Sequence, residues 1–181
     1  LEADRALEVM LDYQEQNPDT LVVVTSDHGH ATQIVRPGEA RRYATVQTAD
    51  GSPMSVGYSS SEGTGQWHTG VEVPIAAKGP QAANVSGVMD QTELYDLLVG
   101  YEPDDPAERT EETEAEVNPS KPRNTIVLLL DGFDEQLLTA ARNYELGADG
   151  RFLLDELPFR GVVTTHGLLP GSGPNYGINY V

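Results

Sequence analysis

Cysteine is absent from this 181-residue sequence, which excludes disulfides and thiolate metal sites without fixing the compartment. Basic residues are scarce: 11 Lys and Arg stand against 29 Asp and Glu, for a formal net charge of -18. Nucleic acids and anionic membranes are bound mainly through Lys and Arg, so we expect neither as a partner. No apolar run approaches the roughly 18 residues of a membrane-spanning helix, and we expect no membrane span.

The chain is 38% hydrophobic, which is enough for a domain with a real core. It begins at Leu1 rather than Met, without a signal-like apolar segment, and it ends at Val181 in a pattern typical of a strand. These features predict a fragment of a longer protein, cut at both ends.

The acidic charge is concentrated in one segment. Residues 102–117 contain eight Asp or Glu and the single Arg109, a net charge of -7, which leaves -11 for the other 165 residues. With several prolines and no apolar periodicity, residues 102–121 are predicted to be a disordered linker between a first section, 1–101, and a second, 122–181. The remaining acidity is typical of a surface adapted to salt, although moderately acidic proteins are also common.

Both sections have the pattern of an α/β fold, in which buried strands alternate with amphipathic helices. In the first section we expect a helix at 1–16, strands at 20–26 and 71–79, two short strands around a turn within 43–58, and a helix at 90–101. In the second section we expect a strand at 124–130, a sharp turn, a helix at 134–146 and a strand at 159–167.

Polar side chains follow two of these strands, at the place where open α/β sheets bind ligands. Asp27, His28 and His30 come after "TLVVVTS", and Asp131 comes after "IVLLL". An adjacent Asp and His can direct an oxygen and a nitrogen at one divalent ion, with His30 as an outer partner. The alternatives are a polar loop for the histidines and an ordinary turn or helix cap for Asp131. Considered alone, His68 in "GQWHTG" is most simply a structural loop residue.

Three phrases point to one family. "TLVVVTSDHGHATQIV", "HTGVEVPIAAKGPQAANVSGVMDQTELYDLL" and "NTIVLLLDGF" with "LTAARNY" closely resemble bacterial alkaline phosphatase. The resemblance implies a three-layer α/β/α sandwich with a largely parallel central sheet, here as two partial sections. It also implies hydrolysis of phosphate monoesters through a phosphoserine intermediate, Zn²⁺ and Mg²⁺ as cofactors, a periplasmic or extracellular parent, and a possible homodimer.

The resemblance also assigns roles to residues of the chain. Asp27 and His28 match ligands of the family's second zinc, and Asp131 matches the carboxylate that bridges this zinc and the magnesium. His68 matches a ligand of the first zinc, and His30 matches the histidine that steadies a carboxylate of that zinc. His166 matches no ligand and is expected to be structural.

The chain departs from the family in order and in content. Residues 1–101 resemble the family's carboxyl-terminal end and residues 122–181 its amino-terminal start, as expected at the junction of tandem domains or in a circular permutation. We favour the tandem junction over a permuted or stitched sequence. The nucleophilic serine is expected in a Thr-Asp-Ser phrase beyond Val181, so the isolated chain is predicted to be inactive.

The sequence is also compatible with two other functions. The turn in "LLLDGFD" is shorter than in most of the family and also resembles phosphodiesterases of the same superfamily. A degenerate domain that only binds metal, or only offers an interaction surface, is the alternative outside the enzymes.

Overall fold

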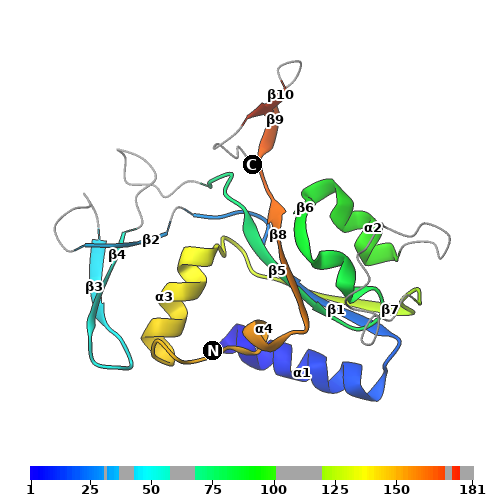
Figure 1. Ribbon diagram of the computed structural model, residues 1–181, viewed down its shortest axis with the longest axis horizontal. Helices are drawn as coiled ribbons and strands as arrows, with labels where there is room; N and C mark the ends of the chain where they lie inside the picture. The colour runs from blue at the N-terminus through cyan, green and yellow to red at the C-terminus, as the bar shows by residue number, and fades with distance from the viewer. Residues whose placement is uncertain (31, 37–42, 58–67, 101–119, 170–172, 176–181) are drawn as a thin grey trace.

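The computed structural model describes the chain except for residues 31, 37–42, 58–67, 101–119, 170–172 and 176–181. The predicted disordered linker at 102–121 therefore lies almost entirely outside the described residues. The centre of the molecule is a five-stranded sheet with helices packed against it, as Figure 1 shows. None of the helices in the described ranges is long and apolar enough to cross a membrane.

The central sheet is mixed but largely parallel. Its strand order is β6 (Gly87–Asp90), β8 (Phe159–Thr164), β5 (Val73–Lys78), β1 (Thr20–Thr25) and β7 (Asn124–Leu129). β1 pairs in parallel with β7, β6 pairs in parallel with β8, and β5 is antiparallel to both of its neighbours. Four of the five strands thus share one direction, and the expected α/β class is confirmed.

Strands from both predicted sections hydrogen-bond in this one sheet. β7 and β8 come from residues 122–181, whereas β1, β5 and β6 come from residues 1–101. β8 lies between β6 and β5, and β7 extends the sheet beyond β1. The sheet, and whatever is built at its edge, therefore requires residues from both sections.

Both faces of β1 are buried, because all six of its residues are inaccessible to solvent. Successive side chains of a strand point to opposite faces. Leu21 and Val23 join a core cluster with residues of the short helix η1 (Ala82–Val85) and of α2 (Leu94–Val99). Val22 and Val24 join a second cluster, with Leu7 of α1 (Glu2–Gln16), Leu138 of α3 (Glu135–Glu145) and Leu154 of α4 (Leu153–Glu156).

The helix boundaries follow local capping chemistry. Asp90 begins η2 (Gln91–Glu93), which leads into α2, and its carboxylate accepts a hydrogen bond from the Thr92 N–H while Glu93 bonds back to the Asp90 N–H. Asp134 caps α3 by accepting from the Leu137 N–H. The helices expected at 1–16, 90–101 and 134–146 are confirmed, whereas β6 and the one-turn helix α4 were not expected.

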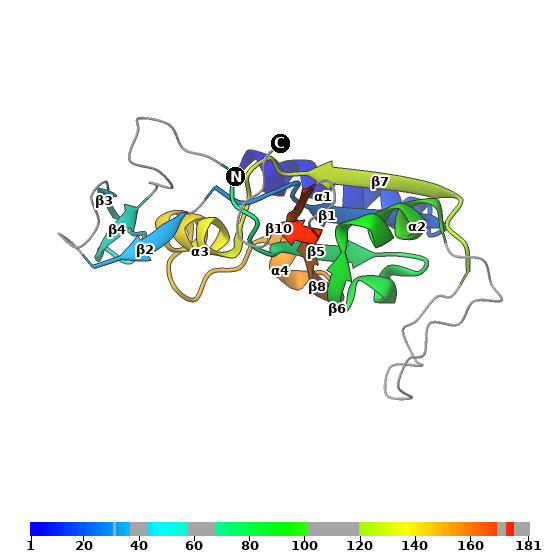
Figure 2. The same ribbon diagram turned by 90° about the horizontal axis from the view of Figure 1, so that it is seen from above.

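A smaller sheet lies beside α3, away from the central sheet (Figure 2). Its order is β2 (Gln33–Val35), β4 (Pro53–Gly57) and β3 (Tyr43–Gln47), and β3 and β4 form the expected hairpin. The Ala49 N–H donates to the Asn143 carbonyl of α3 at 3.0 Å, which ties the hairpin turn to that helix. A further pair, β9 (Gly167–Leu169) and β10 (Gly173–Asn175), is antiparallel.

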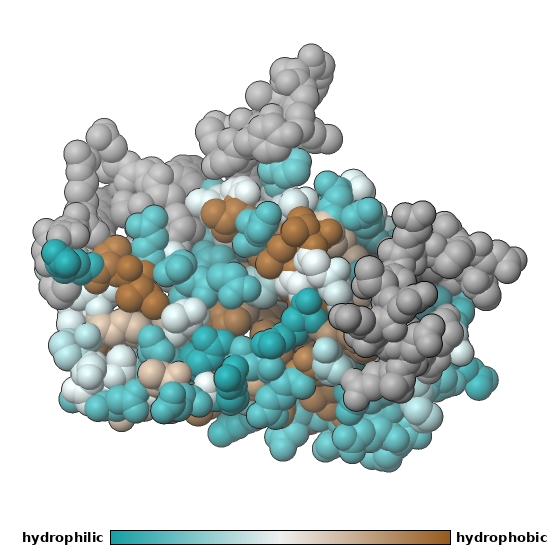
Figure 3. Space-filling view, in the orientation of Figure 1, coloured by the Kyte–Doolittle hydropathy of each residue, from teal (hydrophilic) through white to brown (hydrophobic). Residues whose placement is uncertain are grey.

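One expectation about burial is wrong. The run "NTIVLLL" is predicted to be a buried strand, but β7 is the last strand of the central sheet and is partly exposed, with Val127 38% and Leu129 56% accessible. Among the described residues, β7 has a neighbouring strand on one side only, so its apolar composition does not translate into burial. Elsewhere, Figure 3 shows a face on which hydrophilic residues surround separate patches of apolar ones.

Candidate metal centre

The metal-ligand candidates of the two sections meet at one edge of the central sheet. β1 and β7 are in register from Thr20 opposite Asn124 to Thr25 opposite Leu129, and they run in the same direction. Asp27 and His28 follow the end of β1, and Asp131 follows the end of β7. Parallel pairing therefore brings together residues 104 positions apart in the sequence, at the carboxyl ends of the strands.

The three side chains form a compact set of donor atoms. His28 Nε2 lies 3.5 Å from Asp27 Oδ2 and 3.4 Å from Asp131 Oδ1. The His28 side chain is only 4% exposed, whereas the Asp27 and Asp131 side chains are 38% and 84% exposed. The imidazole is thus fixed in the protein, and the two carboxylates border on solvent.

The orientation of Asp27 is set by backbone groups. Its Oδ1 accepts hydrogen bonds from the His28 N–H at 3.0 Å and from the Gly132 N–H at 3.2 Å, which leaves Oδ2 to face His28. Partial burial raises the pKa of Asp27, but the N–H bonds from Gly132 and His28 and the nearby imidazole outweigh it, so the pKa lies below its usual range. Asp27 is therefore a carboxylate at neutral pH, with one oxygen available.

The Ser26 hydroxyl connects the segment after β1 to the segment after β7 by hydrogen bonds. The one O–H of this buried hydroxyl has two acceptors within reach, the Leu130 carbonyl at 2.6 Å and the His28 carbonyl at 2.9 Å, and its oxygen accepts from the Phe133 N–H at 2.9 Å. These bonds hold the turn that contains Asp131 against the segment that contains Asp27. Because the hydroxyl is buried and already bonded, Ser26 has a positioning role rather than that of a nucleophile.

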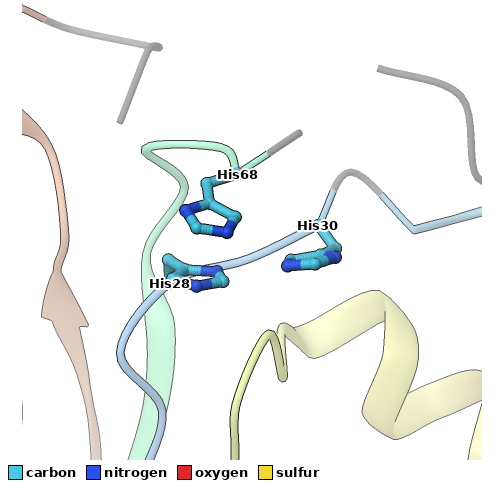
Figure 4. Close-up of side chains that lie close together, drawn as sticks. All are labelled: His28, His30 and His68. Carbon is cyan, nitrogen blue, oxygen red and sulfur yellow. The ribbon is translucent and has the colours of Figure 1, made fainter. Parts of the chain in front are cut away.

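Two further imidazoles lie beside His28, as Figure 4 shows. His68 stacks on His28 with ring centres 3.6 Å apart and planes 17° apart. The His30 ring centre lies 4.9 Å from that of His28 and 5.1 Å from that of His68. Burial lowers the pKa of His68, the neighbouring His28 and His30 lower it further, and the carboxylates of Asp131 and Asp27 oppose this only in part. His68 is therefore neutral at pH 7, the form in which an imidazole binds a metal.

The segments that bear these histidines approach each other closely. Gly29 and Thr69 form an isolated antiparallel bridge, with the Thr69 N–H donating to the Gly29 carbonyl at 2.9 Å. A Cβ added at Gly29 would lie 2.5 Å from a methyl group of Val71, so a larger residue there would force that side chain to shift. The bridge places His68 beside His28, although the two are 40 positions apart in the sequence.

His30 is positioned by the turn that follows Asp131. Its N–H donates to Asp134 Oδ2 at 3.3 Å, while the other oxygen of Asp134 caps α3. Gly132 has a φ of +69°, and a Cβ added there would lie 2.8 Å from the His30 ring. The glycine thus makes the turn and leaves room for the ring.

The donor spacing fits a metal ion at the carboxylate end of this cluster. Donor atoms bound to one tetrahedral zinc ion at about 2.0–2.2 Å lie about 3.3–3.6 Å from each other. The 3.4 and 3.5 Å separations around His28 Nε2 match this edge, and all three donor atoms lie within 4.8 Å of one another. The described residues contain two groups that could hold an ion, one of Asp27, His28 and Asp131 and one of His28, His30 and His68, and the two share His28.

The structure therefore brings together all five residues singled out from the sequence, namely Asp27, His28, His30, His68 and Asp131. His166 follows β8, lies near Asp90 and belongs to neither group. Sequence reasoning missed Ser26 and Asp134. The signal for Asp134 was its position as a helix N-cap, whereas a serine between a strand and an aspartate carries no signal of its own.

Comparisons with known proteins agree with the motifs. No family model matches the chain. A streptomycin-6-phosphate phosphatase from Streptomyces griseus is 51% identical over 96 residues, which are 51% of this chain and 21% of that protein. Alkaline phosphatase H from Pseudomonas aeruginosa and alkaline phosphatase from Escherichia coli are each 43% identical over 97 residues, 52% of this chain and 20% and 21% of theirs.

The expected resemblance to alkaline phosphatases is confirmed. It extends over about half of the chain, and the chain covers only about a fifth of the length of these relatives. A match of this extent does not establish the activity, the substrate or the partners of the whole protein.

Proposed function

We propose that this chain is part of a metal-dependent phosphomonoesterase of the alkaline phosphatase type, which hydrolyses phosphate monoesters through a phosphoserine intermediate. The single observation that supports it best is the meeting of Asp27, His28 and Asp131 at the ends of β1 and β7, with donor atoms at the spacing of a tetrahedral zinc edge. The similarity of half of the chain to phosphatases agrees with it.

In this proposal Asp27, His28 and Asp131 would hold a zinc ion and Asp131 would also serve a magnesium ion. His68 would be a ligand of a further zinc, and His30 would steady that site. Bound zinc would supply positive charge to the phosphate oxygens and to the attacking oxygen. The chain's own residues orient the donors: the Gly132 and His28 N–H groups fix one oxygen of Asp27, and Ser26 fixes the Asp131 turn.

We propose further that the 181-residue chain has no phosphatase activity by itself. Its sequence contains no Thr-Asp-Ser phrase, and Ser26, the serine beside the metal ligands, keeps its hydroxyl bonded to backbone groups. A serine becomes a usable nucleophile only when a base can take the proton of its hydroxyl or a coordinated metal stabilises the resulting alkoxide.

The wider setting follows from the resemblance. We propose a three-layer sandwich fold, two sections that adjoin in a tandem or permuted order, and a periplasmic or extracellular parent that forms a homodimer and does not bind nucleic acid. The net charge of -18 supports the last point. Core clusters that contain residues of α2 on one face of the sheet and of α1, α3 and α4 on the other support the first.

Zinc titration of the metal-free chain tests the site. Asp27→Asn, His28→Ala and Asp131→Asn should each weaken zinc binding more than about tenfold, because each removes one of three donors. His68→Ala should change it little, and Asp149→Asn, at an exposed acid outside both groups, is the matched control. Equal zinc affinity in the wild type and the three ligand variants would contradict the proposed site.

Hydrolysis assays address the activity. The chain should release no phosphate from an aryl phosphate with Zn²⁺ and Mg²⁺ present, and release that is abolished by His28→Ala would overturn the inactivity. Cleavage of a bis-aryl phosphate would instead favour the phosphodiesterase alternative, which the short turn around Gly132 supports. Zinc binding without any turnover agrees with both the proposed phosphatase fragment and a degenerate metal-binding domain. A nucleophilic serine in the adjoining sequence would favour the phosphatase fragment over the degenerate domain.

A further inference from the structure

Arginines gather around a cleft that the proposed phosphatase site does not use. Its volume is about 610 Å³, and most of its lining comes from β5, β8, α3 and α4, which can be followed in Figure 1. None of the five candidate metal ligands lines it. Three of the 11 basic residues of this acidic chain do, namely Arg142, Arg151 and Arg160. We propose that this cleft is a second binding site, which takes the phosphate group of a small organic molecule.

Arg142 is fixed in the wall of the cleft. Its Nε–H and Nη2–H groups donate to the two carboxylate oxygens of Asp155 at 3.1 and 2.6 Å, and its side chain is only 18% exposed. A guanidinium has more N–H donors than the two that this pair uses. The other N–H groups of Arg142 are not bonded to any of the described residues, so they can serve an anion in the cleft.

Arg151 and Arg160 carry charge that the fold does not neutralise. Arg151 precedes α4, and Arg160 lies on β8 opposite Ala76 of β5. Both are exposed, and neither forms an ion pair within the part of the chain that the structure describes. Two guanidinium groups at the same cleft therefore lack a carboxylate partner.

The effect of Arg160 reaches the buried acid of the cleft. Burial raises the pKa of Asp155, but the bonds from Arg142 and the Phe152 N–H, together with the charges of Arg142 and Arg160, lower it below its usual value. The other acid of the lining, Glu135, lies at the opposite end of α3 from Arg142, about 10 Å away along the helix axis at 1.5 Å per residue. The end of the cleft near Asp155 is therefore positively charged.

The chemistry of guanidinium groups favours phosphate as the anion. A phosphate monoester group carries a charge of about -1.5 to -2 near pH 7 and has three acceptor oxygens. Guanidinium donates to phosphate through pairs of N–H groups, and these charge-assisted bonds are stronger than neutral ones. A carboxylate has a single charge and two oxygens, so it would use fewer of the donors that the cleft offers.

The size and the apolar lining of the cleft favour an organic ligand over a free phosphate ion. Sites for small organic molecules have volumes of roughly 300–1,000 Å³, and the cleft falls within this range. Apolar side chains line it beside the arginines, among them Leu138 of α3, Leu154 of α4 and Val162 of β8. A free ion would leave these side chains in contact with water, whereas the organic part of a phosphate ester would cover them.

Calorimetric titration of the full chain with phenyl phosphate tests the inference. EDTA keeps the chain free of metal, so the result does not depend on the proposed phosphatase site. Phenyl phosphate should bind with saturation at one equivalent, and Arg151→Gln and Arg160→Gln should each weaken binding by about tenfold or more, because each removes charge-assisted hydrogen bonds. Since neither side chain is in an ion pair, circular dichroism and thermal melting of both variants should match the wild type.

Two kinds of control make the result specific. Arg123→Gln removes the same charge at an 82% exposed side chain outside the cleft and should leave the affinity unchanged. Benzoate, which offers a ring with a carboxylate, and inorganic phosphate, which has no organic part, should both bind more weakly than phenyl phosphate. In the wild type, NMR resonances of the Arg151 and Arg160 Nε–H groups should shift with phenyl phosphate.

Three results would overturn the inference. The first is an affinity that Arg151→Gln and Arg160→Gln leave unchanged, or that Arg123→Gln lowers as much. The second is equal or tighter binding of benzoate, which would remove the preference for phosphate. The third is equal or tighter binding of inorganic phosphate, which would assign the cleft to the free ion.

Discussion

The Ser26 hydroxyl is a small group on which both the fold and the candidate metal centre depend. Ser26→Ala removes one oxygen from a buried position and adds nothing. The Phe133 N–H and the Leu130 carbonyl, bonded to the hydroxyl at 2.9 and 2.6 Å, both lose that partner. These two groups belong to the end of β7 and the turn after it, so the variant loosens the position of Asp131 relative to Asp27.

The expected magnitude follows from these two bonds. A typical intramolecular hydrogen bond contributes about 0.5–1.5 kcal/mol net, and a buried group left unsatisfied costs about 1–3 kcal/mol. We therefore expect Ser26→Ala to lower the free energy of unfolding by about 2–3 kcal/mol. Because Asp131 supplies one of three proposed donors, zinc affinity should fall as well, by about 10–100-fold as for other residues that orient a ligand.

Urea unfolding and zinc titration measure the two effects, with Ser55→Ala as the matched control. Ser55 is also buried, but its hydroxyl bonds to Thr45 within the small sheet at 2.8 Å. The control should lose about 1 kcal/mol of stability and no zinc affinity. A Ser26→Ala protein with a loss of stability no greater than the control and unchanged zinc affinity would refute the reasoning.

Three further predictions concern charge and backbone. Because the net charge is -18, the melting temperature should rise between dilute buffer and molar NaCl, and a flat or falling value would remove the salt-adapted interpretation. Burial raises the pKa of Asp155, but the paired bonds from Arg142 and the bond from the Phe152 N–H outweigh it and hold this pKa below its usual value of 3.8. Asp155→Asn should therefore lower the free energy of unfolding by about 3 kcal/mol near pH 7. In urea unfolding, the difference between the wild type and this variant should vanish as the pH falls through the folded-state pKa of Asp155. Gly132 and Gly51 both have positive φ, so Gly132→Ala and Gly51→Ala should each lower the free energy of urea unfolding by about 1 kcal/mol. Only Gly132→Ala should shift the NMR resonances of the His30 ring, because its Cβ would lie 2.8 Å from that ring.

Local patterns were enough to predict most elements of the fold. Alternating and continuous apolar runs placed β1, β5 and β7 within one or two residues of their observed ends, and the helices α1, α2 and α3 followed from spacing and caps. β6 and α4 were missed because each has four residues, too few for a period to show. The exposure of β7 could not be predicted, since burial depends on which strands lie beside it and not on its own composition.

The site shows the same division between local and long-range information. The position of Asp27 and His28 after one strand, and of Asp131 after another, predicted donors at a sheet edge. Their meeting depends on the parallel pairing of β1 with β7, which nothing in either segment specifies. The stack of His28 and His68 depends in turn on the Gly29 to Thr69 bridge, which only the folded chain reveals.

The order of the strands also determines what holds the two sections together. Residues 1–101 supply Asp27 and His28, and residues 122–181 supply Asp131, so neither section contains the whole donor set. An ion can bind all three donors only when β7 is paired with β1. An ion that binds the folded form alone stabilises that form by about 2.7 kcal/mol when the free ion concentration is a hundred times the dissociation constant. That is comparable to the contribution expected from the Ser26 bonds, and both act on the same junction. If the proposed ion binds there, metal binding and the docking of the second section form one linked equilibrium, in which the partly exposed strand β7 would gain from the ion part of the stability that burial does not provide.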